Sequence, residues 1–204
     1  VPPMCQLLKS LLATLALLPA GVVCADTPSL APTEAAYRKL AAEILNDIYA
    51  RNPSYATALG LHEYDARLED ASRAAVDDET RAVARFKTAL EAIDPKALTL
   101  DSRLDRELLL HSLDARRIGN EEIRSWARNP DAYSSGITGA AFVIISRDYA
   151  PAAERLKSLI AREKAMPAVL QEARRNLDSP PRIYTEIAID QLDGNQGFFK
   201  TTVV

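Results

Sequence analysis

The two histidines, His62 and His111, are the residues of this sequence best suited to acid–base or metal chemistry. His62 and Glu63 begin like the H-E-x-x-H motif of zinc peptidases, in which two histidines on one helix face bind the metal. Position 66 is alanine, so the second histidine of that motif is absent. A zinc site normally needs three protein ligands. We therefore interpret His62 as an ordinary loop residue and His111 as a residue at the edge of a helical core.

Acidic residues form a second group that could do chemistry. They gather between positions 65 and 79, as Asp65, Glu69, Asp70, Asp77, Asp78 and Glu79. Such a cluster attracts cations, but its pattern is more typical of a solvated loop and the start of a helix. Ser134-Ser135-Gly136 has the composition of a turn, and the sequence contains neither a G-x-S-x-G nucleophile elbow nor a Gly-rich phosphate loop. The sequence predicts no catalytic, cofactor-binding or metal-binding residue and no cofactor in this chain.

The composition predicts helices to position whatever site exists. The 204 residues are 48% hydrophobic and 26% charged, with only 7 glycines, and strong helix formers dominate. We expect an all-α fold of antiparallel helical hairpins and a bundle. The formal charge of -3 and the lack of a long basic run argue against nucleic acid and anionic membrane surfaces as partners.

The N-terminus is typical of a secretion signal. An apolar run follows Lys9, and small residues precede a cleavage point after Ala25. We predict a signal peptide over 1–25, a linker over 26–33 and a helical domain over 34–204. The protein would then be exported to the periplasm or outside the cell, with no membrane attachment after cleavage.

Two alternatives to a cleaved signal remain open. A short membrane anchor is disfavoured, because the apolar run falls short of the roughly 20 residues that a span needs. A lipoprotein signal at Cys24 is the minor alternative, since Val22 and Val23 are poor matches for the small residues expected there. Both cysteines, Cys5 and Cys24, lie in this segment, so a mature chain from residue 26 would form no disulfide.

The first helices of the domain are marked by helix-starting prolines. Pro32 begins one, whose apolar stripe runs over 37–49 and whose outer face would pair Glu34 with Arg38. Asn52 is predicted to cap a second, short helix that starts at Pro53.

Later helix boundaries are predicted from caps and breakers. Asp77 or Asp78 would cap one helix, and Thr99 or Asp101 would open a longer one, apolar enough to be buried on two sides. We expect an irregular segment over 128–139 and a kink or restart at Pro167. Residues 182–192 fit a strand or a helix, and we favour a helix because a strand would have no partner.

Four phrases of the sequence together resemble a known family. They are Asn-Pro-Ser-Tyr-Ala-Thr-Ala-Leu-Gly over 52–60, Arg-Asn-Pro-Asp-Ala-Tyr over 128–133, Arg-Asp-Tyr-Ala-Pro over 147–151, and Asn-Leu-Asp-Ser-Pro-Pro-Arg-Ile-Tyr-Thr-Glu-Ile-Ala-Ile over 176–189. Their order and spacing resemble the N-terminal part of the bacterial family called domain of unknown function 885, over residues 34–199. Members of that family are much longer, exported or lipid-anchored, all-helical proteins.

The resemblance carries an expectation about function. Family members look like zinc metallopeptidases of the thimet-oligopeptidase and carboxypeptidase Taq type, with the zinc-binding helix and the third ligand in the C-terminal half. No residue of this chain matches that motif. The resemblance implies a truncated N-terminal part of such a fold, inactive alone, whose partner is the missing C-terminal half and whose full-length relatives use zinc and act on peptides. The alternative is a freestanding periplasmic helical module that binds a partner or small ligand.

Overall fold

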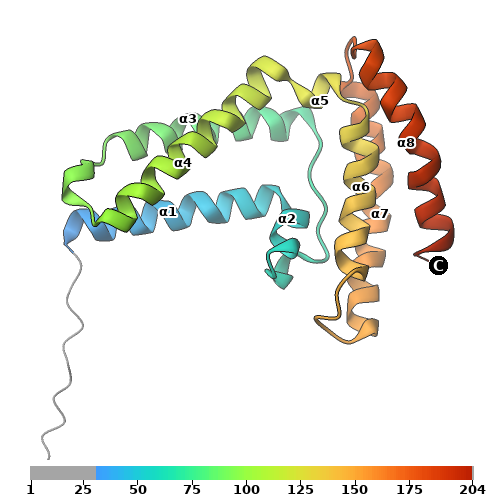
Figure 1. The fold of residues 1–204 in the computed structure, drawn as a ribbon, viewed down its shortest axis with the longest axis horizontal. Coiled ribbons are helices and arrows are strands. Elements are labelled where there is room, and N and C mark those ends of the chain that lie inside the picture. Colours follow the sequence, from blue (N-terminus) through green and yellow to red (C-terminus); the bar gives the residue numbers. More distant parts are fainter. Residues whose placement is uncertain (1–30, 204) are drawn as a thin grey trace, which may run out of the picture. The chain divides into compact units, whose positions relative to one another are not determined.

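The computed structural model describes residues 31–203, and every regular element in this range is helical (Figure 1). The long helices are α1 (Pro32–Arg51), α3 (Arg73–Glu91), α4 (Leu100–Ile118), α6 (Asp131–Ile145), α7 (Ala152–Asn176) and α8 (Arg182–Thr201). The short ones are α2 (Pro53–Ala58), α5 (Ser125–Arg128), η1 (His62–Tyr64), η2 (Pro95–Ala97) and η3 (Gly119–Ile123). The all-α prediction is confirmed, and so is the helix expected over 182–192.

Some expectations concern residues outside this range. The predicted signal peptide, 1–25, and most of the predicted linker, 26–33, lie outside the described residues. Helix α1 starts at Pro32, where its ring fits the first helical position. Within residues 31–203, the helices are either too short or too polar to cross a bilayer.

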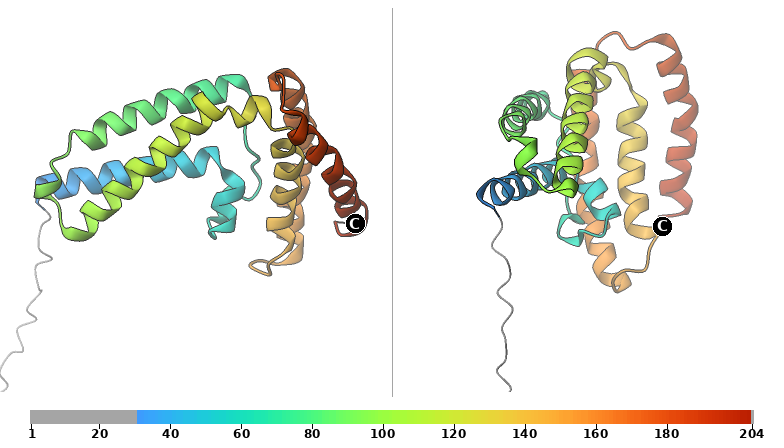
Figure 2. Two further views of the ribbon diagram at one scale, coloured as in Figure 1. Left: turned by 45° about the horizontal axis from the view of Figure 1, so that its top comes forward. Right: turned by 60° about the vertical axis from the view of Figure 1, so that its left-hand side comes forward.

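The first hydrophobic core lies between α1, α3 and α4 (Figure 2). Helices α3 and α4 form an antiparallel hairpin, and α1 packs against both. The buried apolar side chains of this core come from all three helices and from the turn before α4, and they are Tyr37, Ile44, Ile48, Ala82, Val83, Phe86, Leu90, Leu98 and Leu113.

The second core lies between α6, α7 and α8. Helix α6 packs against both α7 and α8, and α7 runs antiparallel to the other two (Figure 2). Its fully buried members are fewer, namely Ala141, Ile144, Leu159 and Met166. Phe198 and Phe199 of α8 close this core from the outside. Helix α2 contacts α6 and so joins the two cores.

Glu34 is buried, contrary to the outer-face position that the sequence suggested. Its pairing with Arg38 is correct, at 2.9 Å, but the carboxylate also accepts hydrogen bonds from the Ser102 hydroxyl at 2.6 Å and the Thr99 amide at 3.1 Å. Glu34 thus satisfies donors at the start of α4, where a negative charge is favourable. The sequence showed the i,i+4 pair but could not show that α4 would begin beside α1.

Two predicted caps are corrected by the structure. Helix α3 starts at Arg73 with Ser72 as its cap, because the Ser72 hydroxyl accepts the Ala75 amide, and Asp77 and Asp78 lie inside the helix. At α2, Asn52 stands at the cap position, but its side-chain amide donates to the Ile48 carbonyl instead. The Ser54 amide at the start of α2 is bonded by a distant carboxylate, described below. Thr99 does cap α4, as predicted.

The predicted irregular segment over 128–139 is mostly helix. Helix α6 starts at Asp131 and passes through both glycines, Gly136 and Gly139. The Asp131 carboxylate accepts a hydrogen bond from the Ser135 hydroxyl at 2.6 Å, which ties down the first turn. Burial of Tyr133 and other residues of α6 outweighs the weak helix propensity of glycine and serine.

Helix α7 continues through Pro167 from Ala152 to Asn176, so the predicted restart is wrong. Pro167 is exposed, and it lacks the amide that would bond the carbonyl four residues earlier. Met166 and Ala173 are buried on the opposite face. Packing on both sides of the proline keeps the helix whole.

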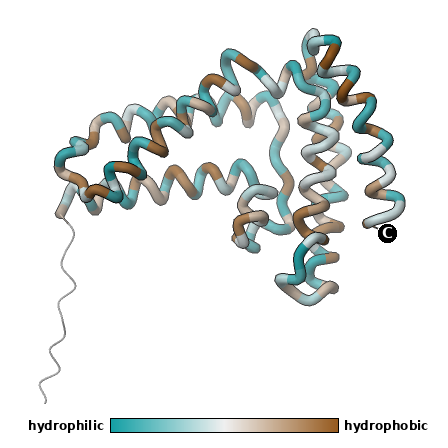
Figure 3. The backbone as a smooth tube through the Cα atoms, viewed as in Figure 1, coloured by the Kyte–Doolittle hydropathy of each residue, from teal (hydrophilic) through white to brown (hydrophobic). Residues whose placement is uncertain are grey.

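Helix α4 is buried on one side only, whereas the sequence predicted burial on two. Leu113 is 1% exposed in the first core, but Leu108 is 69% exposed and Leu104 is 55% exposed. Brown segments along α4 in Figure 3 mark this apolar sequence. The apolar width of the helix exceeds what the described residues cover.

Candidate functional site

A hollow of about 330 Å³ lies between the segment that links α2 to α3 and the segment that links α6 to α7. Its lining comes from residues far apart in the sequence, which are His62, Asp65, Tyr149, Ala150, Glu154, Arg155 and Ser158. Two of the phrases that carry the family resemblance, 52–60 and 147–151, lie at or beside it. Among the described residues, this hollow combines an imidazole, a phenol and carboxylates.

His62 is held from two directions. Its ring stacks on the Tyr149 ring with centroids 3.8 Å apart and planes 7° from parallel. Its Nδ1 lies 3.2 Å from the Asp65 carboxylate. Asp65 is buried, whereas His62 is exposed. His62 is therefore an oriented histidine with a buried carboxylate partner, and its description as an ordinary loop residue is corrected.

Tyr149 is held by burial of its phenol oxygen as well as by its stack on His62. Its phenol oxygen is buried and has no hydrogen-bond partner within the described part of the chain. Burial and the nearby Asp65 carboxylate raise the pKa of Tyr149 to about 12. The phenol thus stays protonated at neutral pH, with the Asp65 carboxylate nearby as a possible acceptor.

Arg162 connects the segments near the hollow. It is fully buried, and it donates to the Ala140 carbonyl at 2.6 Å and to the Thr57 hydroxyl at 2.7 Å, with a longer contact to the Tyr64 carbonyl at 3.4 Å. These acceptors belong to α6, α2 and η1. Burial lowers the pKa of Arg162, which the negative charges of Glu69 and Asp65 oppose. One side chain thereby fixes α7 against three segments that surround the hollow.

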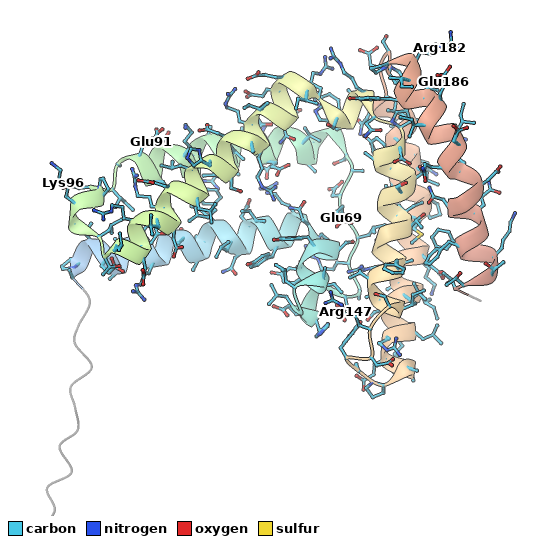
Figure 4. The ribbon with its side chains drawn as sticks, viewed as in Figure 1. Glu69, Glu91, Lys96, Arg147, Arg182 and Glu186 are labelled. Carbon is cyan, nitrogen blue, oxygen red and sulfur yellow. The ribbon has the colours of Figure 1, made fainter. Side chains whose placement is uncertain are left out.

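A second set of polar contacts fixes the two linking segments. Glu69 accepts from the Ser54 amide at 2.9 Å and from its hydroxyl at 3.0 Å, so a distant carboxylate occupies the N-terminus of α2. Arg147 donates to the Ala58 carbonyl at the other end of α2, at 2.8 Å. Figure 4 labels both residues, Glu69 beside α2 and Arg147 at the turn between α6 and α7.

Arg155 orders the α6–α7 segment next to the hollow. It bonds the Asp148 carboxylate at 2.6 Å and the Ala150 carbonyl at 3.1 Å. Tyr149 lies between these two partners in sequence, so the contacts of Arg155 help to place its ring. The guanidinium is largely occupied by these bonds, whereas the His62 ring is exposed and more able to meet a ligand.

The geometry supports hydrogen bonding and proton exchange at the His62 ring. A neutral imidazole that donates from Nδ1 to Asp65 leaves Nε2 as an acceptor, the arrangement that general bases use. Ser158 lines the same hollow, but no hydrogen bond connects it to His62 in residues 31–203.

The described residues do not fit a zinc site. Over residues 31–203, no three His, Cys, Asp or Glu side chains are grouped so that they could hold a metal ion. Since zinc normally takes three protein ligands, His62 and Asp65 are one short. His111 is exposed on α4, far along the chain from the hollow, and is not the core-edge residue that the sequence suggested.

The acidic cluster between positions 65 and 79 does not converge. Asp65 pairs with His62 and Glu69 caps α2, as above, so these two are structural rather than solvated. The others pair locally or across helices: Asp70 with the Ser72 amide, Asp77 with Arg73, Asp78 with Arg51, and Glu79 with Arg116. Asp70, Asp78 and Glu79 line a second hollow, of about 440 Å³, where Asp78 and Glu79 are already paired with arginines.

Arg162 and Tyr149 are the site residues that sequence reasoning missed. A signal for Arg162 was present, because it falls in the inward stripe of α7 between Leu159 and Met166. A charged residue at such a position implies a buried partner. Tyr149 lies in the phrase 147–151 that carries the family resemblance, but its stacking on His62 could not be predicted, because the two linking segments meet only in space.

Comparison with known proteins places this architecture. The sequence pattern of a family described as bacterial protein of unknown function (DUF885) matches residues 53–203. Among solved structures, the chain is similar to a proposed lipoprotein of unknown function from Shewanella oneidensis, with a TM-score of 0.71 and 26% sequence identity. The match covers 78% of this chain and 29% of that protein, so the chain spans less than a third of the relative's length. A search of curated proteins finds no match.

Proposed function

Because the chain belongs to the bacterial family DUF885, as its four phrases indicated, we propose that it is the N-terminal helical part of a longer, exported protein that resembles zinc metallopeptidases. In this proposal the chain supplies scaffold and one wall of a substrate cleft, and zinc and its ligands come from the C-terminal half. Full-length members would hydrolyse peptides, and this chain alone would be inactive.

The observation that carries the proposal is the share of the relative that the chain spans. It matches 29% of the solved Shewanella protein, yet this match takes up 78% of the chain. The export route is proposed from the signal-like residues 1–25, with a lipid anchor at Cys24 as the alternative.

A peptidase assay tests this proposal. The full 204-residue chain is incubated with a library of internally quenched peptides, with zinc and with a metal chelator. We expect no zinc-dependent hydrolysis by the chain alone. Zinc-dependent hydrolysis by the purified chain would overturn the proposal, provided that it persists after a second purification step and is lost in the His62→Ala variant.

The second candidate function is a freestanding periplasmic module that binds a partner or a small ligand. It is favoured by the hollow at His62, Asp65 and Tyr149, where an exposed imidazole is held by a buried carboxylate and an aromatic stack. A monomeric chain with one cooperative unfolding transition would support this candidate. Aggregation of the purified chain would instead support the first proposal.

A further inference from the structure

Helix α4 carries an apolar seam on the face that points away from the first core. Leu104 is 55% exposed, Leu108 is 69% exposed and Ile118 is 36% exposed. His111 and Ala115, which lie between them in sequence, are also exposed. We name these five residues, 104, 108, 111, 115 and 118, the α4 seam. The core side of the same helix is occupied by Leu109 and Leu113.

The spacing of the α4 seam is that of a coiled-coil contact. Its members are separated by four, three, four and three residues, so they repeat every seven positions. This period keeps one stripe facing a partner helix that packs at a shallow angle. Scattered exposed leucines need no explanation, but four apolar residues at this period, interrupted only by His111, favour a helical occupant.

Most charged residues beside the α4 seam are acidic, with the exposed Arg103, one turn before Glu107, as an exception. Asp105 and Glu107 border it on opposite sides and are exposed. Asp114 and Glu121 follow on the Glu107 side, where they bond Lys87 and Arg117 of this chain. Flanking positions of a helix pair select partners by charge. A helix that suits this seam has Lys or Arg beside its own apolar stripe.

We propose that the α4 seam is the docking site for an amphipathic helix with basic flanks, contributed by the part of a longer family protein that lies outside the matched 29%. This inference rests on the proposed function, since it supplies the surface by which the N-terminal part joins the rest. The sequence independently predicted that α4 is buried on two sides, and the described residues cover one of them.

A second copy of this chain is the competing occupant. Two copies that pair along α4 in antiparallel fashion, with the twofold axis at the middle of the seam near His111, would bring Glu107 of one copy opposite Asp114 of the other. Like charges directly opposite are unfavourable, so the acidic flanks disfavour self-pairing and favour a basic helix.

Binding of synthetic helical peptides tests the docking site. The probe is a fluorescent amphipathic peptide with leucine at the seam positions and lysine at the flanks, and its twin carries glutamate at the flanks. Fluorescence anisotropy is measured with the full chain, with the double variant Leu104→Gln/Leu108→Gln, and with the control Leu156→Gln/Leu170→Gln. The control removes two exposed leucines of α7, and circular dichroism checks that each variant is folded.

We expect the lysine-flanked peptide to bind the unaltered chain and the α7 control alike. The seam variant should bind about tenfold more weakly or worse, since each buried leucine contributes on the order of a tenfold change in affinity. Glu107→Lys should weaken the lysine-flanked peptide and strengthen its glutamate twin. Equal binding by the seam variant, or no binding by the unaltered chain, would overturn the proposal.

Sedimentation of the chain alone distinguishes the second copy. A dimer that forms with increasing concentration and dissolves in the seam variant would show that this face pairs with itself, contrary to the proposal. Failure of the docking site leaves the peptidase result untouched, because the assay with quenched peptides does not depend on the α4 seam. The two experiments therefore distinguish failure of the docking site from failure of the proposed function.

Discussion

The two cores of the described unit are built on different principles. The α1/α3/α4 core buries nine apolar residues, and its one buried carboxylate, Glu34, bonds hydroxyl and amide donors at its margin. The α6/α7/α8 core buries four apolar residues, and beside it lies a fully buried guanidinium, Arg162, bonded only to neutral acceptors. The first core is held mainly by apolar contact, whereas the second depends on a polar side chain that also shapes the hollow.

This difference teaches where to look for function. Burying a charge without a carboxylate partner costs free energy of folding. A structural role of the side chain would explain why the charge is buried. Here Arg162 joins α7 to the segments that place His62 and Tyr149. The hollow lies beside the polar core, and the apolar core is connected to it through α2. Each prediction below tests one side of this contrast.

The largest effect is expected in the apolar core. Leu113→Ala removes a side chain that is 1% exposed and should lower the free energy of unfolding by about 3 kcal/mol, from lost burial and the cavity left behind. Leu108→Ala on the same helix, 69% exposed, is the control and should change it by about 0.5 kcal/mol or less. Urea denaturation measures both. Equal losses would mean that the two sides of α4 are equally buried in solution.

The next effect belongs to the polar core. Arg162→Ala should lower the free energy of unfolding by about 2 kcal/mol, because it opens a cavity and leaves buried acceptors without donors. Arg174→Ala, an exposed position on α7, is the matched control. The His62 ring resonances should also shift in Arg162→Ala, as η1 loses its tie to α7. Unchanged His62 resonances would mean that Arg162 does not help to position His62.

A pH-dependent effect follows for the margin of the first core. Hydrogen bonds from Ser102, Arg38 and Thr99 lower the pKa of Glu34 from 4.5 to about 2. Since the folded pKa is the lower one, the stabilisation is complete above about 4.5 and is lost as the pH falls toward 2.

Glu34→Gln should remove this part of the acid sensitivity, measured as unfolding free energy against pH. Glu43→Gln, on the exposed side of α1, should leave the profile unchanged. If the Glu34→Gln profile follows that of the unaltered chain, the carboxylate contributes no pH-dependent stability to the first core.

The smallest effect concerns the start of α3. Ser72→Ala removes the hydroxyl that caps this helix and should cost about 1 kcal/mol. Asp77→Ala removes only an exposed pair with Arg73 and should cost about 0.5 kcal/mol or less. Thermal melts of the two variants separate them. A larger loss of stability in Asp77→Ala than in Ser72→Ala would support the helix start that the sequence suggested, with Asp77 as the cap.

The sequence alone determined the helical class, most helix positions and the family. These follow from features local to the chain: apolar residues at helical spacing, prolines at helix starts, and phrases such as 147–151. Where local signals were ambiguous, as at Asp77 against Ser72 or at Gly136, the boundary was missed. Helix ends depend on which side chain reaches a free amide and on burial elsewhere, and neither is written in local composition.

Only the tertiary structure decided the role of individual polar residues. His62 had the composition of a loop residue, and the fold gave it Asp65 and the Tyr149 ring. The spacing of Glu34 and Arg38 predicted a surface pair, but in the fold the start of α4 lies against Glu34. The exposed side of α4 is likewise visible only in three dimensions. The physical reason is common to all three: contacts between residues distant in sequence depend on how helices pack, whereas helix formation depends on neighbours a turn away.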